Sequence, residues 1–153
     1  MNKILSVILI LLPLLALSQT PTNQDCLGAI PVCQYTYTQS NSYSGTGNYT
    51  SEISTGGCPA SCLLSGEKND VWYIFTVQTS GNLNFNITPN SSSDDYDWAV
   101  YNLTNANCSD IYSNSSIQVS CNYSATPGTT GPNGGSSLNC AIYSDVNDNA
   151  VIP

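Results

Sequence analysis

Residues 67–101, EKNDVWYIFTVQTSGNLNFNITPNSSSDDYDWAVY, are the stretch that best defines the fold class of this chain. Every second position of residues 71–77 is valine, tyrosine or phenylalanine, so one face of an extended segment is apolar. Residues 79–82, TSGN, supply a turn, and residues 83–87 return with the same period of two. This pattern predicts a β-hairpin with one buried face.

Further strands are predicted on both sides of this hairpin. After Pro89 the chain becomes too polar to pack, and alternation resumes over residues 98–103. Residues 29–39 and 117–123 show the same period, separated by long loops rich in Ser, Gly and Asn. No helical periodicity occurs beyond the N-terminal apolar run. The sequence therefore predicts an all-β fold, an antiparallel β-sandwich.

The first 18 residues have the features of an export signal. Lys3 precedes an apolar run over residues 4–17, which ends in the small residues of Ala16-Leu17-Ser18. A membrane span is the alternative, but the run is shorter than the ~20 residues that a bilayer requires and contains Pro13. We expect a signal peptide over residues 1–18, a module over residues 19–153, and a secreted or cell-surface location without membrane insertion.

The charge of the exported chain excludes several partners. With Lys3 removed, Lys68 is the one basic residue beside ten Asp and Glu, a formal charge of −9. Nucleic acid and anionic lipid are excluded, because phosphate recognition needs Lys or Arg. The chain has no His, which removes the usual general base and the commonest zinc ligand. We therefore predict that it is not an enzyme.

Seven cysteines in an exported chain favour disulfides. A zinc site on the Cys58 to Cys62 segment is the alternative, but a second ligand pair is missing. Proximity in sequence suggests three bridges, although the connectivity cannot be deduced from sequence; the pairs are Cys26–Cys33, Cys58–Cys62 and Cys108–Cys121. Cys140 is then left over, and an odd thiol suggests a contact with another chain.

Several motifs resemble a known class of bacterial module. They are DC at residues 25–26, AIPVC at 29–33, GE at 66–67, NDVWYIFTV at 69–77 and DYDWAVYNL at 95–103. They resemble N-terminal modules of large surface proteins exported by the type IX secretion route, which often end in a gliding-motility-associated C-terminal sorting domain. The central hairpin is also similar to the bacterial pre-peptidase C-terminal (PPC) domain. That resemblance implies a small, jelly-roll-like β-sandwich attached to secreted enzymes and adhesins.

The chain departs from this pattern at its C-terminal end. Residues 151–153 read as the start of another strand, and an unpaired last strand would leave an open edge. Modules of this class continue through a strand pair that closes the sandwich. We therefore expect a truncated module whose open C-terminal edge, like Cys140, could contact another chain, and type IX secretion only for a longer parent protein.

Asp94, Asp95 and Asp97 form the densest carboxylate cluster and are candidate ligands for Ca²⁺, which prefers oxygen donors on flexible loops. The alternative is that these aspartates cap turns and keep the loop solvated. Residues 145–149, DVNDN, match the first three ligand positions of an EF-hand loop. The required Gly is replaced by Ala150, and no later Glu is present.

Aromatic residues suggest a sugar-binding surface, because flat rings stack on sugar rings. Trp72 and Trp98 lie in predicted strands, where aromatic residues are more often core. The aromatics expected at the surface are Tyr35, Tyr37, Tyr43 and Tyr49. A glycosidase pair of Glu52 and Glu67 is an alternative, but nothing in their spacing places them across a cleft.

These observations predict a non-catalytic extracellular module of a larger exported surface protein. It would act in adhesion or bind a glycan or protein ligand, with Ca²⁺ as a possible cofactor. The alternative is a structural spacer or filament component of the cell surface, in which the Asp loop and the aromatics are inert.

Overall fold

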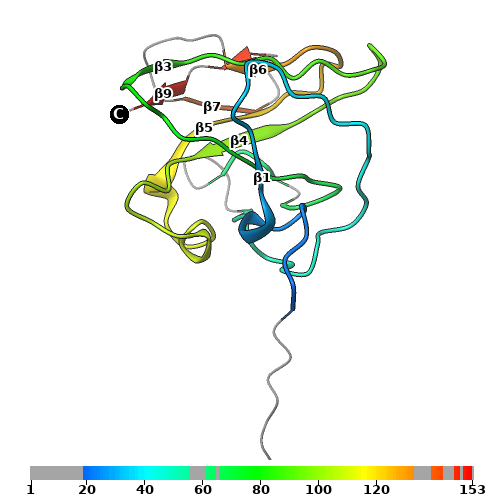
Figure 1. Ribbon diagram of the computed structural model, residues 1–153. Helices are drawn as coiled ribbons and strands as arrows, with labels where there is room; N and C mark the ends of the chain where they lie inside the picture. Colours follow the sequence, from blue (N-terminus) through cyan, green and yellow to red (C-terminus); the bar gives the residue numbers. More distant parts are fainter. Residues whose placement is uncertain are drawn as a thin grey trace, which may run out of the picture.

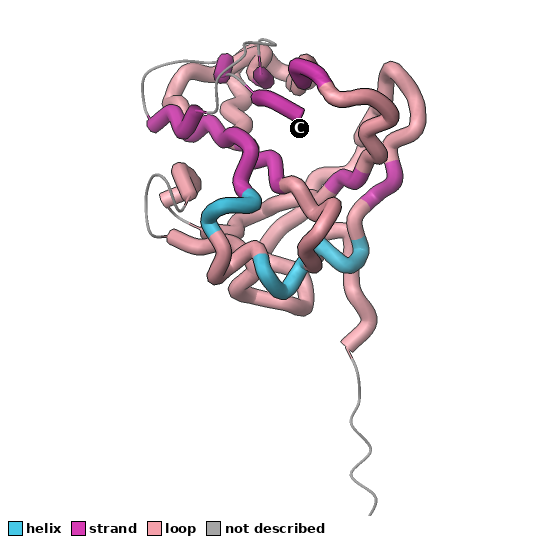
Figure 2. The backbone as a smooth tube through the Cα atoms, turned by 90° about the vertical axis from the view of Figure 1, so that its left-hand side faces the viewer, coloured by secondary structure: helices cyan, strands magenta, loops and turns pink. Residues whose placement is uncertain are grey.

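The computed structural model describes residues 19–55, 61–64 and 66–132, together with the backbone of residues 139–142, 147–148 and 150–152. The predicted signal peptide and most of the EF-hand-like loop lie outside the described residues. Within the described part no helix is long and apolar enough to cross a membrane. Short strands and 3₁₀ turns are separated by long loops (Figures 1 and 2).

The largest sheet in the described part has three strands, in the order β4 (Trp98–Tyr101), β5 (Gln118–Tyr123) and β7 (Asn139–Ile142). β4 and β5 are antiparallel, with Trp98 opposite Asn122 and a register shift at Val100. β5 and β7 are parallel, with Cys121 opposite Cys140. The strands predicted over residues 98–103 and 117–123 are therefore confirmed, with slightly different ends.

The other sheets are two-stranded. β1 (Ile30–Pro31) pairs in parallel with β2 (Tyr73–Ile74), and β6 (Gly131–Pro132) pairs in parallel with β8 (Asn147–Asp148). β3 (Gly81–Leu83) pairs antiparallel with β9 (Ala150–Ile152), so the strand expected near the C-terminus is present. The structure is helix-poor and strand-containing, as predicted.

The predicted hairpin is wrong, because β2 and β3 do not pair with each other. The N-terminal segment occupies one edge of β2: Ile30 N–H donates to Trp72 O at 2.9 Å, and Val32 N–H donates to Ile74 O at 2.8 Å. The strand expected over residues 29–39 is likewise reduced to β1. The strands pair with segments that are far away in sequence. Alternation alone does not encode which segments these are.

Aromatic side chains organise a small core beside the central sheet. Trp98 is buried, meets Phe85 edge-to-face at 5.6 Å and donates its indole N–H to Thr130 Oγ1 at 3.0 Å. Trp72 packs on Tyr101 at 5.9 Å. Polar residues share this interior, which helps to explain why so few long strands form; the fully buried ones include Ser61, Ser120 and Asn122.

Two disulfides join segments that are far apart in sequence, Cys26–Cys108 and Cys62–Cys121. The predicted local bridges are wrong for every one of these four cysteines, because the fold places 3₁₀ turn η1 (Cys26–Gly28) beside η2 (Cys108–Asp110). A zinc role for Cys62 is excluded by its bridge. Cys33 is exposed and has no bridge.

Two further cysteines lie wholly or partly outside the described residues. Nothing is described for Cys58, and Cys140 is described in its backbone only, within β7. The third 3₁₀ turn, η3 (Ser115–Ile117), leads directly into β5.

Candidate functional site

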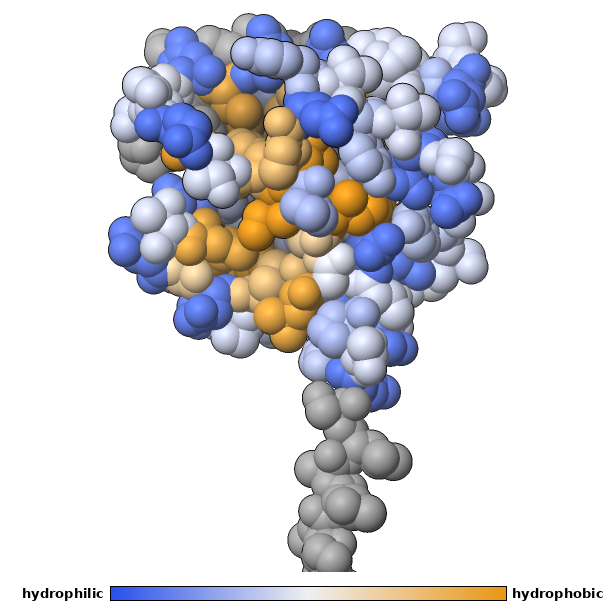
Figure 3. All heavy atoms as spheres, in the orientation of Figure 1, coloured by the Kyte–Doolittle hydropathy of each residue, from blue (hydrophilic) through white to orange (hydrophobic). Residues whose placement is uncertain are grey.

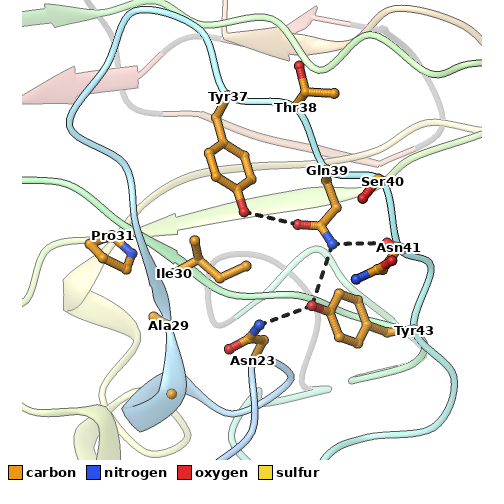
Figure 4. Close-up of a pocket in the computed structure, with 11 residues that line it drawn as sticks. Asn23, Ala29, Ile30, Pro31, Tyr37, Thr38, Gln39, Ser40, Asn41 and Tyr43 are labelled. Atoms are coloured by element: carbon orange, nitrogen blue, oxygen red, sulfur yellow. Dashed lines mark hydrogen bonds between the residues drawn. The ribbon is translucent and has the colours of Figure 1, made fainter.

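A pocket of about 400 Å³ lies between β1 and the loop of residues 37–43 (Figure 4). Among the residues that the structure describes, no charged side chain lines it. The lining residues are Asn23, Gly28, Ala29, Ile30, Pro31, Tyr37, Thr38, Gln39, Ser40, Asn41 and Tyr43. Aliphatic groups come from β1, and amides, hydroxyls and tyrosyl rings come from the loop opposite.

The amide of Gln39 is the centre of the pocket's hydrogen-bond network. Its Oε1 accepts from the Tyr37 hydroxyl at 3.3 Å, and its Nε2 donates to the backbone oxygen of Asn41 at 3.1 Å. The same Nε2 donates to Tyr43 Oη at 3.5 Å, as does Asn23 Nδ2 at 3.0 Å (Figure 4). Because Tyr43 Oη accepts twice, its own proton remains available to a ligand oxygen.

A second tyrosine pair extends the aromatic surface beside the pocket. The rings of Tyr37 and Tyr73 meet edge-to-face at 5.6 Å. Partial burial raises the pKa of Tyr73, and the neighbouring Tyr37, Tyr43 and Tyr96 raise it further. Tyr73 is therefore a neutral hydroxyl donor at physiological pH.

The loop that carries Tyr43 is anchored by Asp25, whose side chain is 0% exposed. Its carboxylate accepts from the Thr22 hydroxyl and from the backbone N–H groups of Thr22, Asn48 and Tyr49. Burial alone would raise the pKa of Asp25, but these hydrogen bonds lower it overall. Asp25 thus acts as an ionised clamp that shapes the loop after Tyr43.

Gly47 is required where the backbone passes close to the Asp25 carboxylate. Its φ is +70°, a conformation that other residues rarely adopt, and an added Cβ would lie 2.4 Å from Asp25 Oδ1. Gly45 extends the clamp, because its carbonyl accepts from Gln24 Nε2 at 3.1 Å and from Asn69 N–H at 2.7 Å. The pocket loop is therefore tied to the N-terminal segment and to the chain that precedes β2.

The sequence identified part of this site. Tyr37 and Tyr43, expected at the surface, both line the pocket. Tyr35 is fully exposed outside it, and the Tyr49 hydroxyl donates to the backbone of Gln19. The amide-bearing residues Asn23, Gln39 and Asn41 were missed, because amides in a Ser-rich loop carry no sequence signal that distinguishes a pocket from a turn. The tryptophans contribute to packing, as the strand pattern suggested.

The predicted calcium ligands lie on an exposed loop far along the chain from this pocket. The backbone of Asp94 forms part of a turn: its N–H donates to Ser91 O, and its carbonyl accepts from Gly128 N–H. Partial burial raises the pKa of Asp97 to about 6, and the charge of Asp95 adds to the shift. Within the described residues no group of three or more His, Cys, Asp or Glu is arranged to hold a metal ion. Calcium binding here stays a prediction, which a Ca²⁺ titration would test.

Glu52 and Glu67, the alternative glycosidase pair, do meet in space, but not across a cleft. Glu52 N–H donates to Glu67 Oε2 at 2.9 Å. Glycosidase carboxyls are separated by roughly 5–9 Å to accommodate a glycosidic bond or a water molecule. Glu67 lines a separate pocket of about 190 Å³, which Glu52 does not line. This geometry does not support the glycosidase alternative.

Comparisons of the chain with protein-family models, with curated proteins and with solved structures found no match. The geometry of the pocket is therefore the basis for the function proposed below.

Proposed function

We propose that this chain is a non-catalytic, extracellular ligand-binding module of a larger surface protein, and that it binds a neutral glycan in the pocket between β1 and residues 37–43. The observation that carries the proposal is the composition of this pocket. In the described part of the chain, two tyrosines and three amide side chains line it, and no charged group does.

Sugar hydroxyls need donors and acceptors at fixed positions, and sugar rings present apolar C–H faces. The pocket offers both, since Gln39 and Tyr43 present polar groups while Ile30 and Pro31 supply an aliphatic wall. Amides and hydroxyls can donate and accept, so the same groups suit several hydroxyl configurations. A pocket built in this way favours a ligand-binding module over an inert spacer.

The charge of the chain narrows the ligand class. The exported chain carries −9, with Lys68 as its one basic residue. Sulfated, sialylated or uronate-containing glycans would be repelled and would find no cation in the lining. Uncharged oligosaccharides are therefore the proposed ligands.

An extracellular setting agrees with the two disulfides, which persist in oxidising compartments. The N-terminal sequence predicts export to such a compartment. Adhesion of the parent protein through this pocket is the role that we propose for the module.

A glycan array probed with the exported chain tests this function. We expect binding to a subset of neutral glycans and its loss in Gln39→Ala, which removes the central amide. Tyr35→Ala is the matched control, because Tyr35 is exposed outside the pocket. Absence of binding to every neutral glycan, or equal binding by Gln39→Ala, would contradict the proposal.

A further inference from the structure

Four carboxylates lie close together beside the chain that leads into β2. Glu67 is 8% exposed, and its Oε2 accepts from Glu52 N–H. Burial raises the pKa values of both glutamates, and the charge of Asp70 adds to each shift. The charge of Asp25 acts in the same way on Glu52 and on Asp70. We call Asp25, Glu52, Glu67 and Asp70 the acidic cluster.

The members of the acidic cluster differ in how their oxygens are satisfied. Both oxygens of Asp25 accept hydrogen bonds, as do one oxygen of Glu52 and one of Glu67. By contrast, Glu67 Oε1 and both carboxylate oxygens of Asp70 are buried and have no hydrogen-bond partner among the described residues. Buried ionised oxygens without partners are strongly unfavourable, so these three oxygens point to a ligand.

The nearest hydrogen-bond donors do not satisfy these oxygens. Burial raises the pKa of Asp70, and its own backbone N–H and the side chains of Gln24 and Trp72 offset this only in part. Gln24 Nε2 donates to Gly45 O at 3.1 Å, and Trp72 Nε1 makes no hydrogen bond in the part of the chain that is described. A proton shared between Glu67 and Asp70 would satisfy two of the three oxygens at most, because one O–H donates to one acceptor.

No basic side chain is buried with these oxygens within the described residues. Lys68 is the one basic residue of the exported chain, and its side chain is exposed. The chain that follows Asp70 is apolar, and Figure 3 shows hydrophobic side chains gathered in a band across the face of the molecule that carries β1. Carboxylates in such low-dielectric surroundings attract a cation from solvent more strongly than carboxylates in water do.

We propose that Glu67 and Asp70 bind a Ca²⁺ ion through these buried oxygens. Within the described residues three carboxylates are not arranged around one metal position, so two carboxylates supply the charge, and backbone or amide oxygens and water complete the ligand set. Ca²⁺ accepts such mixed and irregular sets of roughly six to eight oxygens, whereas Mg²⁺ demands near-octahedral geometry. The site is distinct from the loop of Asp94, Asp95 and Asp97, and its argument does not depend on the glycan.

A path from solvent to this site is present. Glu67 lines the pocket of about 190 Å³, together with the hydroxyl-bearing residues Thr50, Ser51 and Thr55. Hydroxyl oxygens are hard donors of the kind that Ca²⁺ and its water ligands contact. An ion can therefore reach Glu67 without passing through the aromatic core.

Thermal unfolding of the chelator-treated exported chain, in a Ca²⁺ series at constant ionic strength, tests the proposal. We expect the unfolding temperature to rise and saturate, with half of the effect at a concentration on the order of 10⁻⁴–10⁻³ M, the range of extracellular modules. Glu67→Gln and Asp70→Asn should each abolish the rise. Without Ca²⁺ both variants should be at least as stable as the parent chain, because each removes a buried negative charge. Loss of the response is thereby distinguished from loss of the fold.

Asp110→Asn is the matched control, since it also removes one carboxylate and keeps an acceptor for Asn107 N–H, and it should respond to Ca²⁺ as the parent does. Asp95→Asn separates this site from the exposed loop and should also respond. No rise in the unfolding temperature with Ca²⁺ would overturn the proposal. So would an equal rise with Mg²⁺, which would indicate general screening of an acidic chain, or a rise that is lost in Asp95→Asn but persists in Glu67→Gln and Asp70→Asn.

Discussion

The backbone N–H of Glu52 donates to Oε2 of Glu67 at 2.9 Å, while Oε2 of Glu52 accepts from Cys26 N–H at 2.9 Å. The two glutamates thus link the N-terminal turn to the loops on either side of the 190 Å³ pocket. Burial raises the pKa of Glu67 to about 7, and the charges of Asp70 and Glu52 add to the effect. Burial also raises the pKa of Glu52.

This pair predicts a chain that is more stable in mild acid than at alkaline pH. The folded-state pKa of Glu67 lies above its ordinary 4.5, so its contribution is complete below pH 4.5 and is lost as pH rises through about 7. We expect the free energy of unfolding to fall by about 2 kcal/mol between about pH 5 and about pH 8. One pKa unit corresponds to ~1.4 kcal/mol, and some solvent access from the pocket reduces the full effect. Urea unfolding at the two pH values measures it.

Glu67→Gln should remove the share of this pH dependence that Glu67 contributes, since glutamine keeps an acceptor for Glu52 N–H and cannot ionise. The raised pKa values of Glu52, Asp70 and Asp97 leave a remainder of the same sign. Asp94→Asn, on the same exposed loop as Asp97, is the control and should leave the dependence unchanged. An unchanged slope in Glu67→Gln would show that another group is responsible. The lowered pKa of Asp25 acts in the opposite direction, and its contribution is lost only in stronger acid, as pH falls below 3.8.

Breaking the Cys26–Cys108 bridge should destabilise the chain strongly. The bridge closes a loop with a sequence separation of 82, and loop-closure entropy assigns roughly 4–5 kcal/mol to a loop of that length. The double variant Cys26→Ser, Cys108→Ser should therefore unfold at a much lower urea concentration. Cys33→Ser is the matched control and should have the urea midpoint of the parent chain, because Cys33 has no bridge.

Loss of the Asp25 clamp should disturb the pocket loop as well as stability. Asp25→Ala leaves three backbone N–H groups without their acceptor in a buried site, at about 1–3 kcal/mol for each donor that remains unsatisfied. Gly47→Ala should have a similar effect, because its Cβ would collide with the carboxylate. Gly45→Ala is a useful comparison, since it has positive φ but open space around it. Thermal unfolding should rank Gly47→Ala well below Gly45→Ala.

Tyr43→Phe should weaken ligand binding without destabilising the fold. The substitution removes the hydroxyl that accepts from Gln39 and Asn23 and keeps the ring. We expect roughly a tenfold rise in Kd, equivalent to ~1.4 kcal/mol, for any glycan identified on the array. Isothermal titration against that glycan measures it, with Tyr35→Phe as control. An unchanged Kd for Tyr43→Phe would place the ligand elsewhere.

The positions of individual strands could be predicted from the sequence, but the partner of each strand could not. Strands were predicted over residues 98–103 and 117–123 because their alternation is local, and the structure has β4 and β5 there. The 71–87 segment has equally clear alternation, yet its two halves pair with β1 and β9. A period of two tells which side chains share a face, but it does not identify the neighbouring strand. The two-layered sandwich stays a prediction, because the described strands form only small sheets.

The same limit applies to the cysteines and to the site. Cys26 and Cys33 are close in sequence, but a turn and a strand carry them apart, and Cys26 meets Cys108 instead. Tyrosines could be chosen as surface candidates because flat rings stack on sugar rings. Gln39 and Asn23 become functional candidates only when the fold brings residues 16 positions apart to the same tyrosyl oxygen.

The Cys26–Cys108 bridge also determines how the module would respond to mechanical load. A pull on its two ends is transmitted through residues 19–26, across the bridge, and onward from Cys108. Residues 27–107, which include the loop of residues 37–43 and most of the pocket wall, lie outside this covalent path and cannot be drawn out while the bridge is intact. In a surface protein under shear, the covalent path through the bridge would thus bear the tension, and the pocket lining would remain free of it.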